Sequence, residues 1–401
     1  MASAVASAVA SASPSASPLE SINPVPVSQL VAPTAPAAHL DAATAKALQT
    51  ALTGVRTGGA YPGVSAAIVF PDGSVWTGQS GTAVLATRTA VAADTLFSIG
   101  SISKTFVAAL AGRLASRGTI SLDDPLSKYV PTFYLAEKIT LRQLLNHTSG
   151  IKDLFAIKAI TDAILAKPAQ TWTPTQLLTM VGKSRYPFAP GKGYWYSNTE
   201  YVLLGVAIEK ATGRTVADLV RSEFLAPLGL DHTFLQTEEA VTGAEAHGYC
   251  AGTAPGCSSS RAAASKPRDN TAGAMLPFTA EASAVGAAGA FVSTASDIAR
   301  WTEALYSGRV LDEAALASMV DISQTQGFKA PWVPGWLYGL GTEEATINGH
   351  VAWGHRGHLD GFWSATWFLP DFDVSVTILT NAEWATNPTA LVASLAKVAV
   401  P

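Results

Sequence analysis

Phe97-Ser-Ile-Gly-Ser-Ile-Ser-Lys104 is the stretch from which the fold and function of the rest of the chain can be read. A helical pattern follows it to Arg117, which places Ser101 and Lys104 one turn apart on one face at the start of a helix. A hydroxyl there lies beside unpaired backbone N–H groups at the positive end of the helix dipole. This position suits a serine nucleophile, and a lysine within reach can accept or relay its proton.

The Ser-x-x-Lys spacing is not specific by itself. Ser149 and Lys152 have the same spacing, as do Ser394 and Lys397. Most such pairs lie on the solvated faces of ordinary helices, so the choice among the three depends on partner residues elsewhere in the chain.

Composition narrows the class of protein. The chain has 401 residues, of which 48% are hydrophobic and 14% charged, and this suits one or two globular domains with a large core. We find no uninterrupted run of 18 apolar residues and expect no integral membrane segment. The net charge of −4 offers no basic surface for nucleic acid. No Cys/His spacing suggests a metal site, and we expect no cofactor.

Residues 1–37 are nearly all Ala, Ser, Val and Pro, with Glu20 as the single charge. Such a composition cannot offset the entropy of ordering, so we expect a disordered tail. It resembles a tether or the remnant of an export segment, and a tail without function is the alternative.

The only two cysteines, Cys250 and Cys257, lie close together within a Gly- and Pro-containing stretch. A local disulfide is one interpretation and two free thiols are the other. A disulfide requires an oxidising compartment, so this reading indicates a secreted or cell-envelope protein.

The order of expected elements is strands, then helices, then strands, with a helix at each end. Asp41 is the expected N-cap of the first helix, which should end before Gly54. Thr199 is the expected N-cap of a later helix, which should end before Gly213. A long loop is expected at 236–272. Helices are predicted at 41–53, 103–117, 141–145, 161–166, 174–181, 200–211 and 389–398, and strands at 63–70, 74–79, 336–341, 350–354, 362–369 and 374–380.

Two short motifs supply candidate partners for Ser101. Tyr196-Ser-Asn198 precedes the helix at 200–211; a tyrosine whose pKa is lowered by Lys104 would accept a proton, and the asparagine would bind a substrate amide. His355-Arg-Gly357 lies between strand signals. Its glycine permits close approach of a substrate, and the N–H of His358 would be a second oxyanion donor beside that of Ser101. Without further context, Tyr196 could simply be an amphipathic residue that lines a cleft, and Asn198 a turn residue. The segment at 355–357 could be a glycine-rich hairpin turn with a solvated arginine.

His355 and Arg356 would add positive potential for an anionic group of the substrate.

Taken in order, these motifs resemble the serine β-lactamase-like and penicillin-binding superfamily, in the branch of D-alanyl-D-alanine carboxypeptidases and class C β-lactamases. The resemblance runs from about residue 40 to the end. It also covers Leu144-Leu-Asn-His-Thr-Ser-Gly150, which marks the Ser149/Lys152 pair as scaffold, together with Phe188-Ala-Pro-Gly191 and Gly289-Ala-Phe-Val-Ser-Thr294 with Asp297.

The resemblance implies an α+β fold, an α/β sandwich. A five-stranded antiparallel sheet would be flanked by the N- and C-terminal helices. Residues 38–120 and 285–401 would form the sheet domain, and residues 121–284 an inserted helical domain.

The resemblance also implies roles for single residues. Ser101 would be the acylated nucleophile, Lys104 its proton partner, Tyr196 the activator, Asn198 the holder of the substrate amide and His355 the third-motif residue. Arg356 and His358 stand where small hydroxyl residues often bind the substrate carboxylate, which leaves the substrate class open.

The leading hypothesis is a serine hydrolase that resembles a D-alanyl-D-alanine carboxypeptidase. In it Arg356 would pair with the terminal carboxylate of a small peptide such as a peptidoglycan stem peptide. An esterase or a class C-type β-lactamase is the second hypothesis. Some of the C-terminal tryptophans would then line an acyl pocket, whereas core packing is the alternative that explains most of them (Trp332, Trp336, Trp353, Trp363, Trp367). A non-catalytic penicillin-binding or sensor domain is the third. We expect a monomer.

Overall fold

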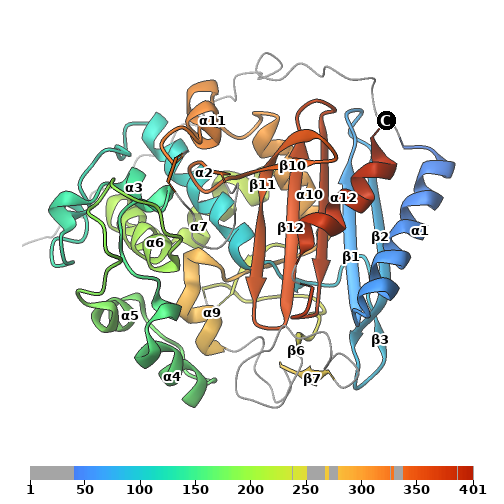
Figure 1. Ribbon diagram of the computed structural model, residues 1–401, viewed down its shortest axis with the longest axis horizontal. Helices are drawn as coiled ribbons and strands as arrows, with labels where there is room; N and C mark the ends of the chain where they lie inside the picture. Colours follow the sequence, from blue (N-terminus) through green and yellow to red (C-terminus); the bar gives the residue numbers. More distant parts are fainter. Residues whose placement is uncertain are drawn as a thin grey trace, which may run out of the picture.

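The computed structural model describes residues 40–236, 238–250, 267–270, 279–325, 327–328, 337–385 and 387–400. Within these ranges an antiparallel sheet occupies one side of the molecule and a group of helices the other (Figure 1). The strand order in this sheet is β3-β2-β1-β13-β12-β11-β10-β9. The mixed α/β class and the antiparallel sheet are as predicted from the sequence.

Both ends of the chain build the centre of the sheet. Strand β1 (Gly63–Val69) pairs with β2 (Val75–Val84) on one side and with β13 (Val374–Thr380) on the other. Strand β12 (Phe362–Leu369) then pairs with β13 and with β11 (His350–Leu359). Every residue of β1 and β13 is buried, because helices cover both faces of the sheet.

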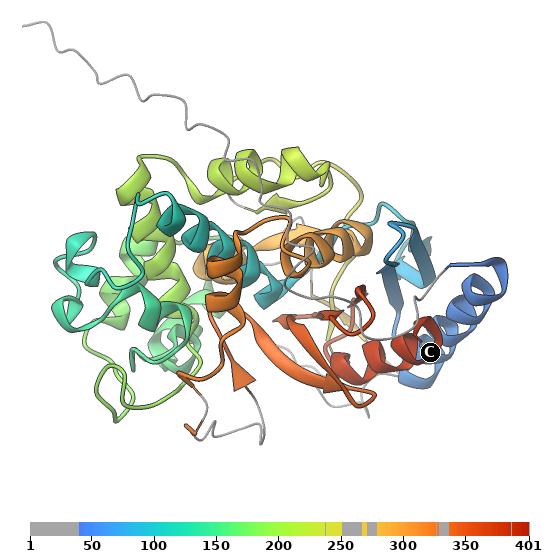
Figure 2. The same cartoon turned by 90° about the horizontal axis from the view of Figure 1, so that it is seen from above.

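The terminal helices α1 (Ala42–Gly59) and α12 (Pro388–Ala399) lie together on one face (Figures 1 and 2). Their apolar side chains pack on those of the sheet, for example Leu52 and Leu395 on Ile68. The other face is covered by α10 (Ala295–Tyr306). Ser375 on β13 donates a 2.8 Å hydrogen bond to the carbonyl of Ala299 on α10.

The strand count of five was wrong, since the sheet has eight strands. The three strands beyond five lie toward the two edges of the sheet: β3 (Thr89–Ala90), β10 (Glu343–Ile347) and β9 (Leu337–Tyr338). Of these, β9 falls within the stretch 336–341 that was predicted as a strand. The sequence Glu-Glu-Ala-Thr-Ile of β10 hides its strand character because the first glutamate is buried in an ion pair with Arg356. Strand β11 is longer than predicted and contains the His355-Arg-Gly357 motif, which is therefore not a turn.

The remaining helices lie mostly beyond the side of the sheet that ends in β11, β10 and β9, toward the left of Figure 1. Helix α2 (Ser103–Ser116) is almost completely buried along its first half. Helices α3 (Leu141–Leu145) and α5 (Pro174–Val181) have their predicted bounds, and α4 (Lys158–Ala166) begins earlier than predicted. The other elements are α6 (Asn198–Thr212), α7 (Val216–Val220), α8 (Ala226–Leu228), α9 (Thr279–Val285), α11 (Glu313–Val320), β4 (Phe97–Ser98), β5 (Phe234–Leu235), β6 (Tyr249–Cys250), β7 (Arg268–Asp269) and β8 (Phe291–Ser293).

Two helix ends differ from expectation. Asp41 caps α1 as predicted, with Oδ1 accepting from Thr44 N at 2.7 Å, but the helix continues past Gly54 to Gly59. Its buried Leu48 and Leu52 hold the helix on the sheet, and this packing outweighs the cost of about 1 kcal/mol for an interior glycine. Helix α6 begins at Asn198 rather than after Thr199, and it ends at Gly213 in the left-handed conformation as predicted.

No helix in the described part of the chain is long and apolar enough to span a membrane. Cys250 ends β6, whereas its predicted disulfide partner Cys257 lies outside the described residues, as do Trp332, Trp336 and the tail at 1–37.

Candidate active site

Ser101 lies in a short 3-10 turn, Gly100–Ile102, that leads directly into α2. The Ser103 hydroxyl donates to the Gly100 carbonyl at 2.6 Å and accepts from the Phe291 N–H at 3.2 Å, which ties the turn to β8. Ile102 is buried and Ser101 is partly exposed. The Ser103 hydroxyl therefore holds the turn against β8, while the Ser101 side chain remains partly accessible to solvent.

Lys104 is the centre of the polar contacts around this serine. Its Nζ donates to Ser101 Oγ at 2.9 Å, to Asn198 Oδ1 at 2.8 Å and to the Ala288 carbonyl at 2.7 Å. The side chain is completely buried, and its Nζ lies 4.8 Å from the centre of the Tyr196 ring. The structure thus brings together the first and second motifs of the sequence.

Burial lowers the pKa of Lys104 to about 7, although Asp153, Glu343 and Glu200 act in the opposite direction. A large share of the lysine is then neutral near pH 7, so its nitrogen has a lone pair available for the Ser101 proton. Lys104 can therefore act as a general base near neutral pH.

Tyr196 has the opposite character from the one predicted. Burial raises the pKa of its phenol well above 10, while its contact with the Ser101 side chain acts to lower it. The expectation that Lys104 would lower this pKa was wrong, because burial of the phenol dominates. Tyr196 is therefore suited to donate or relay a proton at the serine, and Lys104 is suited to accept one.

Asn198 is held in one orientation by Asp153, a residue that the sequence interpretation missed. The Asp153 Oδ2 accepts from Asn198 N at 2.5 Å and from Asn198 Nδ2 at 2.9 Å. The amide oxygen therefore faces Lys104. The carboxylate also caps the first turn of α6, whose N-cap Ser197 makes no side-chain cap bond. An aspartate three residues after Gly150, bonded to Phe155 N two residues on, carries only an Asx-turn signal in the sequence.

The backbone of the third motif, His355-Arg-Gly357, lies directly against the backbone of the turn that carries Ser101. A Cβ added to Gly357 would lie 1.8 Å from the carbonyl oxygen of Ile99, and one added to Gly100, at φ +51°, would lie 2.4 Å from His358 N. Strand β10 pairs with β11 only from His350 to Gly354, so the following residues face the turn. The backbone amide of His358 consequently lies next to the residue that precedes Ser101, where an oxyanion donor is needed.

The side chains of the third motif do not supply the predicted positive potential. His355 is buried, and burial lowers its pKa well below 6.5, so the ring is neutral. It contacts Tyr338, whose hydroxyl lies 3.0 Å from Nε2. Arg356 pairs with the buried Glu343, with Nε 2.8 Å from Oε2. His355 is therefore not a cation, and the positive charge of Arg356 is directed to Glu343 on β10 rather than left open to a substrate.

His358 carries its side chain toward Glu383, with Nε2 2.7 Å from Oε1, and this pair raises the pKa of the imidazole. The ligand atoms of His358, Asp360 and Glu383 lie within 4.8 Å of one another. Among the described residues, this group has the spacing to hold a cation. Glu281 adds a fourth polar group, since its Oε1 accepts from Asp360 N at 3.4 Å.

The two other Ser-x-x-Lys pairs make scaffold contacts. Ser149 is buried and its Oγ lies 2.5 Å from Glu200 Oε1. Ser394 Oγ donates to the Ala390 carbonyl within α12 at 3.0 Å.

Comparison with known proteins agrees with this geometry. The family model described as Beta-lactamase matches residues 44–395. The chain belongs to this beta-lactamase family. It is 26% identical to a beta-lactamase of Escherichia coli K12 over 82% of this chain and 85% of that protein. It is 29% identical to a D-aminopeptidase of Brucella anthropi over 80% of this chain, which spans only 56% of that protein.

Solved structures of the beta-lactamase family's fold include two similar amide hydrolases. A D-stereospecific amidohydrolase from Streptomyces superposes with a TM-score of 0.72 at 31% identity, covering 86% of this chain and 97% of the other. A D-amino acid amidase from Ochrobactrum anthropi gives a TM-score of 0.76 at 27% identity, covering 89% and 98%. The chain is accordingly a serine hydrolase of the beta-lactamase and transpeptidase fold.

Proposed function

We propose that this beta-lactamase-family hydrolase cleaves short amides or peptides of D-amino acids through an acyl-enzyme on Ser101. The observation that carries the proposal is the division of proton roles at the serine: Lys104, with a pKa of about 7, can accept a proton, and the phenol of Tyr196 stays protonated. An amide requires both, because its nitrogen must be protonated before it can leave.

In the acylation step, Lys104 Nζ takes the Ser101 proton as Oγ attacks the substrate carbonyl carbon. The negative oxygen of the tetrahedral intermediate binds the N–H groups of Ser101 and His358. The C–N bond then breaks, and the leaving nitrogen receives a proton from the Tyr196 hydroxyl, which Lys104 replenishes. Water attacks the acyl-enzyme by the same route in reverse and releases the acid.

The charges near His358 favour a substrate that carries an amine. Burial raises the pKa of Glu281 well above its usual range, and Asp360 and Glu383 raise it further, so Glu281 favours its neutral form. The negative charges at the end of β11 are then the carboxylates of Asp360 and Glu383. An ammonium group beside these carboxyl groups would be stabilised, whereas a carboxylate would be repelled. The similarity to D-amino acid amidase and D-aminopeptidase supports the same substrate class.

A D-alanyl-D-alanine carboxypeptidase, acting on a peptidoglycan stem peptide, is the narrower form predicted from the sequence. Arg356 was its expected carboxylate partner, and the ion pair with Glu343 gives that role less support. A monomeric state and an extracytoplasmic location also remain proposals, which size-exclusion chromatography and cell fractionation would test.

A substrate panel separates these activities. Purified protein is assayed with D-phenylalanine amide, its L-enantiomer, an N-acylated peptide ending in D-Ala-D-Ala, and nitrocefin. The proposal predicts the highest kcat/KM for the D-amide. A higher value for the acylated peptide would favour the carboxypeptidase, and one for nitrocefin a β-lactamase.

A further inference from the structure

His147 lies behind the second motif and contacts its first two residues, Tyr196 and Ser197, as well as Trp195, which precedes them. The His147 carbonyl accepts from Trp195 N at 3.0 Å, and Nδ1 lies 3.3 Å from Ser197 N. Between these two bonds, the imidazole packs on the Tyr196 ring, with centroids 4.2 Å apart. One residue, through its backbone carbonyl and its imidazole, therefore holds the loop on both sides of the tyrosine and the tyrosine itself.

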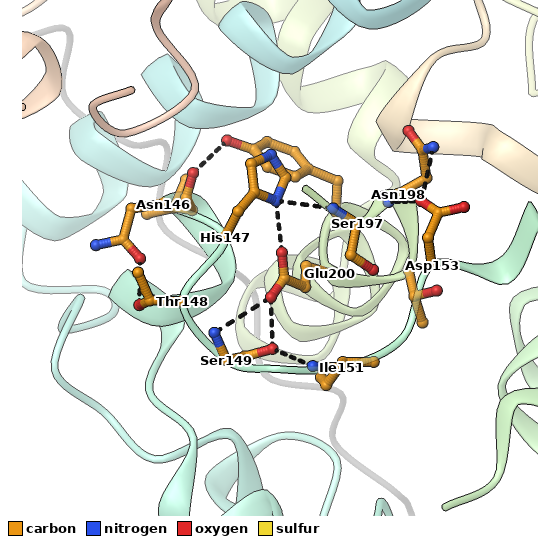
Figure 3. Close-up of polar contacts among 12 residues, drawn as sticks. Asn146, His147, Thr148, Ser149, Ile151, Asp153, Ser197, Asn198 and Glu200 are labelled. Carbon is orange, nitrogen blue, oxygen red and sulfur yellow. Dashed lines mark hydrogen bonds and ion pairs between the residues drawn. The ribbon is translucent and has the colours of Figure 1, made fainter. Parts of the chain in front are cut away.

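Glu200 holds His147 in turn. Its Oε2 lies 2.5 Å from His147 Nδ1, and its Oε1 accepts from Ser149 N at 3.3 Å and lies 2.5 Å from Ser149 Oγ (Figure 3). Glu200 belongs to the first turn of α6, two residues after Asn198. The segment from His147 to Ser149 is thus joined to the helix turn that carries the second motif.

The pair is completely enclosed. Both side chains have no exposed surface. His147 also adopts φ +60°, a left-handed conformation that is costly for a residue with a Cβ, so its surroundings must compensate for it. Burial lowers the pKa of His147 and raises that of Glu200, which favours a net neutral pair sharing one proton.

The same ring connects the second motif to the third. His147 packs 4.8 Å from the ring of Tyr338, and Tyr338 meets Tyr196 edge-on at 6.0 Å. Since the hydroxyl of Tyr338 is bonded to His355, the Tyr196 ring is enclosed by groups from three parts of the chain.

We propose that His147, fixed by Glu200 and Ser149, is a positioning residue for acyl transfer that keeps the Tyr196 hydroxyl at Ser101. His147 acts on the nucleophile through Tyr196. The inference rests on the proposed function, in which Tyr196 protonates the leaving nitrogen.

The test compares an amide with an activated ester. A p-nitrophenyl ester has a leaving group that departs without a proton, whereas an amide depends on Tyr196. His147→Gln keeps a hydrogen-bonding side chain but loses the packed ring. It should lower kcat for the amide about tenfold more than kcat for the ester, with KM little changed. Tyr196→Phe should give the same pattern.

Two further variants separate positioning from stability. Glu200→Gln retains an acceptor for Ser149 and a donor for His147 Nδ1, so the amide-to-ester ratio should stay at the wild-type value. Ser375→Ala removes a buried hydrogen bond outside the site and should lower the thermal unfolding midpoint without changing that ratio.

A double-mutant cycle completes the test. Adding His147→Gln to Tyr196→Phe should leave the amide-to-ester ratio of Tyr196→Phe unchanged, because both changes remove one function. The inference is overturned if His147→Gln lowers both activities in equal proportion, or if the two changes multiply. A wild-type protein that cleaves neither substrate would instead refute the proposed function.

Discussion

Lys104 Nζ lies 2.9 Å from Ser101 Oγ at the end of a completely buried side chain. The hydrogen bond puts the acceptor in place, and burial lowers the pKa of the lysine to about 7, which makes it a base. Arginine cannot take this role because it stays protonated. Lys104→Arg should therefore lower the rate of acylation by about 10²–10⁴-fold. Stopped-flow acylation with an activated ester would measure it, and Lys397→Arg on α12 is the matched control that should retain the wild-type rate.

The same pKa predicts the pH dependence of the reaction. Neutral lysine is the active form, so kcat/KM should fall as pH decreases through about 7 and reach a plateau above it. His147 and His355 should not contribute in this range, because burial lowers both pKa values well below 6.5. A profile that is flat between pH 6 and 9 would contradict the assignment of Lys104 as the base.

Lys104 should also cost stability. Its pKa is about 7 in the folded state and near 10.5 when exposed, so the unfolded chain binds more protons between these values. Its penalty is therefore complete below pH 7 and decreases as pH rises toward 10.5. Lys104→Met should stabilise the inactive protein at pH 6 by about 1–3 kcal/mol, and by less at pH 9. Urea unfolding at the two pH values measures this, and an equal or reversed difference would contradict it.

Asp153 should matter for both α6 and the site. Asp153→Ala removes the acceptor of Asn198 N and Nδ2, so we expect a loss of about 1–2 kcal/mol from the uncapped helix and about a tenfold lower kcat. Asp41→Ala is the matched control, because it removes the cap of α1 on the far side of the sheet. It should cost a similar free energy of unfolding and leave kcat unchanged. Equal kcat in the two variants would exclude an orienting role for Asp153.

The contact of β11 with the serine turn permits no side chain at 357. Gly357→Ala would place a methyl group against the Ile99 carbonyl, and we expect a loss of about 2–4 kcal/mol together with slower acylation. Gly54→Ala in α1 has open space around it and should instead stabilise the protein by about 0.5–1 kcal/mol. Calorimetric unfolding of both variants tests whether Gly357→Ala lowers the free energy of unfolding and Gly54→Ala raises it.

The parts of the site predicted from sequence are those with local spacing. Ser101 and Lys104 are three residues apart, in the 3-10 turn and the first turn of α2 that follows it, so their proximity follows from local spacing. Tyr196-Ser-Asn198 lies directly at the start of α6 and was recognised as a motif. Asp153, His147 and Glu200 act across 45 to 53 residues and carry no local pattern of their own. The proton affinities of Tyr196 and His355 were predicted wrongly because burial sets them, and the Glu343 partner of Arg356 was missed because sequence spacing does not reveal it.

Of the three serines that precede a lysine by three residues, Ser101 alone should form the acyl-enzyme. Intact-mass analysis and peptide mapping after incubation with a β-lactam or an activated D-aminoacyl ester test it directly. We predict one adduct, on the peptide that contains Ser101, present in Ser394→Ala and absent in Ser101→Ala. An adduct of the same size on Ser101→Ala, or on a peptide that contains Ser149 instead, would contradict the claim.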